Sequence, residues 1–143
     1  MAPSNLDEAI RSAESLQHSV SAGSIDLAYH ELEKSLVEFE SQGYPIDSIL
    51  LQEEAGTLGF AKKLKTTKEG KSFWQLYKEM IKKRLCQKSG ELNKLIKSGI
   101  HASVGAVLTA IVAGLGLPAA ALVVLIPIAV IIFNTGIDAF CAL

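Results

Sequence analysis

The fold of this chain is decided by residues 98–143, which read SGIHASVGAVLTAIVAGLGLPAAALVVLIPIAVIIFNTGIDAFCAL. Between Lys97 and Asp138 this stretch contains no Asp, Glu, Lys or Arg. An uncharged apolar run of about 18 or more residues is long enough to cross the hydrocarbon core of a membrane as one helix, and this run is about twice that length. The sequence therefore predicts a membrane segment.

A Gly- and Pro-rich break divides the apolar run into two arms. The break reads GLGLP, from Gly114 to Pro118. Gly relaxes the backbone, and Pro suits the first turn of a new helix. We therefore expect a transmembrane helical hairpin. Its second arm, residues 122–133, has Val, Ile and Leu on all sides, which suits lipid contact, and Pro127 inside it predicts a kink or a break.

The first arm carries small residues along one face. Helices in lipid associate through small residues, because these let two backbones approach closely. We therefore expect a helix-packing or oligomer face made of Ser103, Ala106, Ala110, Ala113 and Gly114. This face packs either against the second arm of the same hairpin or against another subunit, and the two arrangements are compatible.

Three polar side chains are candidates for a polar membrane face, namely His101, Thr109 and Asp138. An ionisable group inside a membrane segment usually faces a partner or a water-filled space. For Asp138 the alternative is that the chain has already left the membrane at residues 134–136, so that the carboxylate is simply hydrated. We favour this second interpretation.

Charge is segregated along the chain, although the formal net charge is only −1. Residues 1–54 carry eleven acids and two bases, a net −9, whereas residues 55–97 carry twelve bases and three acids, a net +9. Lysines beside a membrane are attracted to anionic headgroups by roughly 1 kcal/mol each. We expect such contacts from Lys82, Lys83, Arg84, Lys88, Lys94 and Lys97. Positively charged segments next to a membrane-spanning helix stay on the cytoplasmic side of the membrane. These residues therefore also predict an inner or plasma membrane protein whose N-terminal part is cytoplasmic.

Residues 1–97 show helical periodicity and no strand-like alternation. Apolar residues recur at spacings of three and four in several stretches, each preceded by a residue that suits the start of a helix. The stretches begin near Ser4, Ser24, Tyr44 and Thr66. The expected fold class is therefore all-α. An N-terminal bundle of about four helices (residues 1–97), a cytosolic interaction and regulatory domain with a basic neck, precedes the transmembrane hairpin (residues 98–143).

Catalytic and metal-binding patterns are absent from the sequence. His18, His30 and His101 do not fall at zinc-ligand spacings, and there is no nucleophile elbow, Walker A motif or GxGxxG motif. We therefore expect no enzyme activity, no cofactor and no metal. Cys86 and Cys141 flank the apolar run without a CxxC spacing, so we expect reduced cysteines rather than a disulfide.

The basic region also contains the aromatic residues Phe73, Trp74 and Tyr77, a combination that invites a nucleic-acid interpretation. These aromatics fall largely on the apolar stripe of a predicted helix. We therefore expect them in the core, and we expect anionic lipid rather than nucleic acid to contact the lysines.

By layout alone, the chain resembles small bacterial membrane effectors, such as those of anti-phage defence systems, in which a helical cytosolic domain is coupled to a short helical hairpin. The resemblance implies a toxin-like or antiviral effector. We expect that the N-terminal domain binds a cytosolic protein partner or self-assembles, and that the hairpin inserts and oligomerises to permeabilise or depolarise the membrane. A single hairpin cannot enclose a pore, so a pore-forming homo-oligomer is required.

Two other interpretations fit the same residues. In one, the hairpin is a passive membrane anchor, and the protein is an adaptor that recruits a cytosolic partner. In the other, the chain is a helical protein whose apolar hairpin is buried in a partner or in an oligomer. Harm to the cell on overexpression separates an effector from an anchor, and solubility without detergent supports the third interpretation.

Overall fold

The computed structural model describes residues 5–44, 49, 70–98 and 103–142. Over these residues the chain is all-helical and forms no strand, which confirms the expected fold class. The segment expected after Tyr44, the proposed caps at Ser4 and Thr66, and the candidate His101 lie outside the described residues. Ile49 is described, and it is buried.

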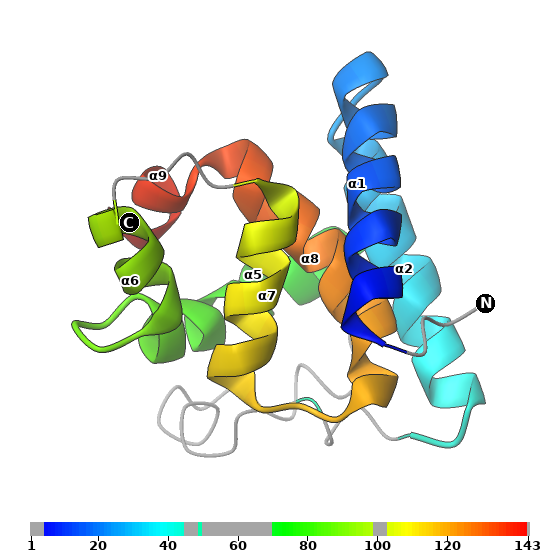
Figure 1. The fold of residues 1–143 in the computed structure, drawn as a ribbon. Coiled ribbons are helices and arrows are strands. Elements are labelled where there is room, and N and C mark those ends of the chain that lie inside the picture. The colour runs from blue at the N-terminus through cyan, green and yellow to red at the C-terminus, as the bar shows by residue number, and fades with distance from the viewer. Residues whose placement is uncertain (1–4, 45–48, 50–69, 99–102, 143) are drawn as a thin grey trace.

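The first two helices, α1 (Leu6–Ala22) and α2 (Asp26–Ser41), lie side by side (Figure 1). Asn5 caps α1, since its side-chain oxygen accepts a hydrogen bond from the Glu8 N–H at 2.9 Å. Helix α2 ends at Gln42, and Gly43 follows with a φ of +92°. A positive φ favours glycine, so Gly43 suits the position just after the end of this helix.

The basic region forms α5 (Gly70–Leu85) and α6 (Glu91–Ser98). The turn between them contains Gly90. Phe73, Trp74 and Tyr77 are all buried, which confirms that these aromatics belong to the core. Helix α5 therefore presents its aromatic face inward and exposes Lys71 and Lys83, as an amphipathic helix should.

The apolar run forms α7 (Val104–Leu115), the 3₁₀ turn η2 (Ala119–Ala121), α8 (Leu122–Thr135) and the short α9 (Ile137–Ala142). The break between α7 and α8 lies where the sequence predicts it, and Gly116 adopts the left-handed conformation there, with a φ of +61°. Pro127 does not interrupt α8. Gly136, with a φ of +92°, ends α8 and separates it from α9.

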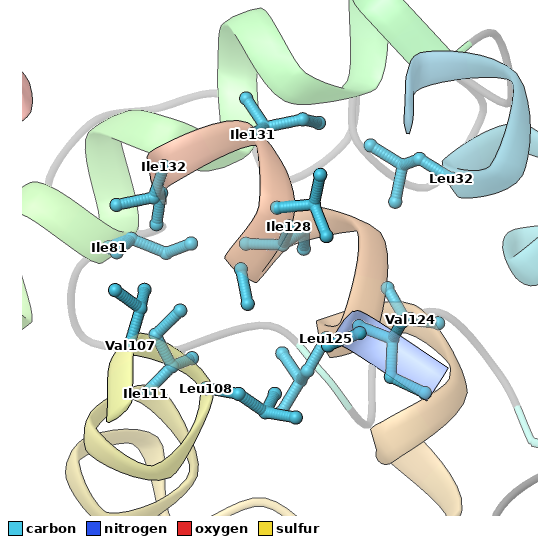
Figure 2. Packing of buried hydrophobic residues seen from close by; sticks show 14 of the residues in the cluster. Leu32, Ile81, Val107, Leu108, Ile111, Val124, Leu125, Ile128, Ile131 and Ile132 are labelled. Carbon is cyan, nitrogen blue, oxygen red and sulfur yellow. The ribbon is translucent and has the colours of Figure 1, made fainter. Parts of the chain in front are cut away.

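Helix α8 is the central helix of the molecule. Every residue from Leu122 through Ile132 is buried, and α8 packs against α1, α2 and α7. Figure 2 shows Leu125 beside Leu108 of α7, and Ile132 close to Ile81 of α5. The expected lipid-facing arm is therefore covered by side chains of its own chain. The physical reason is that a helix apolar on all sides needs apolar surroundings, and neighbouring helices supply them as well as lipid does.

One hydrophobic cluster contains buried residues from both sides of the expected domain boundary at residues 97 and 98. The helices of the N-terminal region and the apolar helices thus share a core. Among the residues that the structure describes, no helix combines the length and the apolar character that crossing a bilayer requires.

Candidate functional site

The feature that distinguishes this fold is the apolar pair, defined as α7 and α8, and the helices that cover it. We call α1, α2, α5 and α6 the outer helices. Ala9 and Ala13 of α1 are completely buried, and their small side chains let α1 approach the pair closely. A Cβ added to Gly105 of α7 would lie 2.9 Å from Cγ2 of Ile10, so α7 and α1 are also in close contact. The outer helices thus cover the pair at short range.

Helix α2 covers the pair with larger side chains. Leu32, Leu36 and Phe39 are fully buried, whereas Asp26 is exposed and the glutamates of α2 are half-buried. Figure 2 shows Leu32 pointing toward α8. Helix α2 therefore combines buried apolar residues with partly exposed charged ones and is amphipathic, in contrast to α8.

A pair of side-chain amides joins α1 to the C-terminal end of α8. Nδ2 of Asn134 donates to Oε1 of Gln17 at 2.6 Å, and Nε2 of Gln17 donates to Oδ1 of Asn134 at 3.3 Å. Asn134 Nδ2 also donates to the Val130 carbonyl at 2.7 Å. The end of α8 is thereby positioned against α1 by polar contacts, whereas the rest of the helix is held by apolar packing.

A disulfide joins Cys86, the residue after α5, to Cys141 in α9. The expectation of reduced cysteines is therefore wrong. The two cysteines flank the apolar pair, and a helical hairpin returns its two ends to the same place, so they come together in space. The spacing of the two cysteines does not report this proximity; only their position on either side of a predicted hairpin hints at it.

Aromatic packing next to the disulfide also holds α9 on α5. The rings of Trp74 and Phe140 stack with centroids 5.8 Å apart, and the Lys82 ammonium lies 5.4 Å from the centroid of the Phe140 ring. Lys82 also pairs with Glu79 at 3.8 Å, and only 12% of its side chain is exposed. Of the expected headgroup contacts, Lys82 is therefore largely committed to contacts inside the molecule.

The other expected headgroup residues lie along α5, the following turn and α6. Lys83, Lys88, Lys94 and Lys97 are exposed, and Arg84 is half-buried. Lys94 pairs with Glu91 at 3.2 Å while 62% of its side chain stays exposed. We call Lys83, Lys88 and Lys97 the basic surface. Its contact with lipid remains a prediction.

The structure divides the expected helix-packing face. Ser103 caps α7 by accepting a hydrogen bond from the Ala106 N–H at 3.1 Å. Ala106, Ala110 and Ala113 line an open groove of about 360 Å³ between α6 and α7. Gly114 instead packs inside the chain, because a Cβ there would collide with Cδ2 of Leu85. Packing of this face between subunits remains a prediction.

The candidate polar membrane face has two described members on different helices. The Thr109 hydroxyl, exposed on α7, donates to the Gly105 carbonyl at 2.8 Å. Asp138 is exposed in the first turn of α9, where the helix dipole favours an acid. Membership of one membrane face remains a prediction for both residues.

Among the described residues, Tyr77 has an ionisable group that is fully buried. Its hydroxyl donates to the Ile49 carbonyl at 2.6 Å, and burial raises the pKa of Tyr77 above its ordinary value. Within the described ranges, no three His, Cys, Asp or Glu residues are grouped closely enough to hold a metal ion. No family model, no curated protein and no solved structure matches this chain.

Proposed function

We propose that this protein is a membrane-permeabilising effector whose insertion element is the apolar pair, enclosed by the outer helices in the state described above. The observation that carries the proposal is α8, which is apolar on every side from Leu122 through Ile132. Helices of small domains usually keep a polar face, whereas a helix apolar all round is typical of the core of a large protein or of a membrane span.

The amphipathic outer helices support the proposal. The residues of α1 and α2 that are buried against the core are almost all apolar, while the charged residues of these helices are exposed or half-buried. An amphipathic helix of this kind lies well at a membrane interface, with its apolar face in the acyl region and its charges in water. When the outer helices separate at a membrane, α8 exchanges one apolar environment for another, because lipid tails are as apolar as leucine side chains.

The charge distribution supports an orientation at the membrane. The basic surface lies on α5, the following turn and α6, which come immediately before the apolar pair in the chain, whereas the acidic residues concentrate in residues 1–54. An anionic bilayer attracts the first region and repels the second. The protein should therefore approach anionic lipid with the basic surface and place the apolar pair near the headgroups.

Permeabilisation requires several copies, because one helical pair cannot enclose a channel. The groove beside Ala106, Ala110 and Ala113 supports assembly, since small residues allow a helix of a second copy to approach α7. The proposal therefore includes a homo-oligomer formed in the membrane.

The proposal is tested by dye release from vesicles of phosphatidylglycerol and phosphatidylcholine with purified full-length protein. The informative variant carries Lys83→Gln, Lys88→Gln and Lys97→Gln. At roughly 1 kcal/mol per lysine, vesicle affinity should fall by about a hundredfold. The matched control carries Lys34→Gln and Lys71→Gln, which alter exposed lysines of α2 and of the start of α5 and should leave release close to the wild-type level.

Three results would count against the proposal. Failure of the wild-type protein to bind anionic vesicles would reject it and leave α8 as a core helix. Binding without release would favour the passive anchor. Equal losses in the lysine variant and its control would reject the role of the basic surface.

A further inference from the structure

We infer that the Cys86–Cys141 disulfide is a redox latch that holds α9 folded back on α5 and thereby keeps the C-terminal apolar helix short. The inference about α9 stands on the contacts described above. Its consequence for membrane insertion rests on the proposed function. The latch is defined as the disulfide together with the stack of Phe140 on Trp74.

Helix α9 is too short to be stable by itself. It has only 6 residues, and isolated helices shorter than about 12 residues are marginal in water. It is joined to α8 through Gly136, whose φ of +92° sets the change of direction between the two helices. Helix α9 therefore keeps its place through tertiary contacts, and the disulfide is the covalent one among them.

Helix α8 is shorter than the hydrocarbon core of a bilayer is thick. Helix α8 has 14 residues and is about 21 Å long, while the hydrocarbon core of a bilayer is about 30 Å thick. Residues 119–142 as one continuous helix would measure about 36 Å. Asp138 is the one charged residue in that range, and it would lie near the end of the helix, within reach of the headgroups. Release of α9 is thus what permits a helix of spanning length.

A small dithiol opens the latch by thiol–disulfide exchange. Cys86 and Cys141 are both half-buried, so a small dithiol has access to the bond. A thiolate of the dithiol attacks one sulfur, forms a mixed disulfide and displaces the other cysteine as a thiolate. The second thiol of the reagent then displaces the first cysteine. The products are two reduced cysteines and one oxidised dithiol, so the protein disulfide gains two electrons and the reagent loses two.

The chain contains an optical reporter for this step. Trp74 is the single tryptophan, it is 4% exposed, and it stacks directly on Phe140 of α9. Cys86 and Cys141 are the two cysteines of the chain, so a thiol reagent acts on this bond alone. Departure of α9 uncovers the indole ring and should shift its emission to longer wavelength.

The first experiment compares Trp74 emission of the full chain before and after dithiothreitol, with helix content followed by far-UV circular dichroism. We expect a shift to longer wavelength with helix content largely kept. The variant with Cys86→Ser and Cys141→Ser should show the shifted spectrum with or without the reductant. If that variant does not fold, reduction of the wild-type chain remains decisive. Unchanged emission on complete reduction would overturn the latch.

The second experiment adds dye-filled vesicles of phosphatidylglycerol and phosphatidylcholine to the oxidised and the reduced protein. We expect reduction to speed release at least tenfold. Equal release in both states would overturn the latch as a gate while leaving the proposed function intact. An emission shift without release in either state would uphold the latch on α9 and reject the proposed function. The two proposals therefore fail through different results.

Discussion

Helices α7 and α8 are similar in composition and occupy different places in the fold. Helix α8 is buried on every side from Leu122 through Ile132. Helix α7 buries Val107, Leu108 and Ile111 and leaves Thr109 and Ala113 exposed. Hydropathy therefore indicates that a helix needs an apolar environment, but not how much of its circumference the chain itself will cover. The arrangement of the neighbouring helices decides that: each of the two helices contacts several others, but those around α8 cover it on every side.

The sharpest test of this difference is truncation of one residue in each helix. Ile128 of α8 is 0% exposed, and Ile128→Ala should lower the free energy of unfolding by roughly 2–5 kcal/mol, because it removes buried contacts and leaves a cavity. Thr109→Ala in α7 is the matched control and should change stability by less than about 0.5 kcal/mol. Urea denaturation measures both. Equal losses would mean that the two helices are buried to the same extent.

The second test compares a buried tyrosine hydroxyl, that of Tyr77, with the partly exposed one of Tyr44. Tyr77 of α5 donates a buried hydrogen bond to the Ile49 carbonyl. Tyr77→Phe leaves that carbonyl without its donor and should cost roughly 1–3 kcal/mol. Tyr44→Phe, at a residue that is 40% exposed, should cost less than about 0.5 kcal/mol. A similar cost for the two variants in thermal or urea unfolding would contradict the role of the buried hydrogen bond.

The same tyrosine predicts a pH dependence. Burial raises the pKa of Tyr77 above its ordinary value of about 10, so the unfolded chain releases this proton at a lower pH than the folded protein. Its contribution to stability is complete below about pH 10 and declines as the pH rises above that value. Urea midpoints between about pH 9 and pH 11.5 should fall less steeply in Tyr77→Phe than in Tyr44→Phe. If the urea midpoints of the two variants fell equally steeply with pH, ionisation of Tyr77 would not be the cause of the loss of stability at alkaline pH.

A smaller effect should come from the junction between α8 and α9. Gly136 has a φ of +92°, and an added Cβ would meet only ordinary contact, with Ala139 Cβ at 3.9 Å. Gly136→Ala should therefore cost about 1 kcal/mol through its backbone conformation alone. Gly43→Ala, at the same φ after α2, should cost a similar amount. Only Gly136→Ala should alter Trp74 emission, and a change in both variants would argue against a local effect on α9.

Several features of this fold follow directly from the sequence. The break at Gly116, the end of α8 at Thr135 and the inward aromatic face of α5 were predictable because glycine, proline and helical periodicity act locally. The cover of α8 was not predictable in this way, because lipid and a protein core are both apolar. The Cys86–Cys141 bond depends on how the helices fold in space, and cysteine spacing alone does not report that.

The smallest expected change in stability concerns the open side of α7. Ala106 borders the groove beside α6, so Ala106→Leu should alter the free energy of unfolding by less than about 1 kcal/mol. If α7 meets a second copy through this face, the larger side chain should lower the yield of cross-linked oligomers in vesicles without lowering vesicle binding. Gly114→Leu is the contrasting variant, because its side chain collides with Leu85 and should destabilise the monomer itself. Unchanged oligomer yields in Ala106→Leu would place the contact elsewhere.

The Cys86–Cys141 bond also determines how the molecule responds to mechanical pulling. Force applied at the two ends of the chain passes through the sulfur atoms and bypasses the intervening segment, whose ends are 55 positions apart. At about 3.4 Å per residue, roughly 190 Å of contour length is withheld while the bond is intact. An unfoldase that pulls proteins through a narrow pore would therefore have to pass two lengths of polypeptide side by side at this segment. In a single-molecule pulling experiment, the contour length of the unfolded chain should increase by roughly 190 Å once a reductant is added.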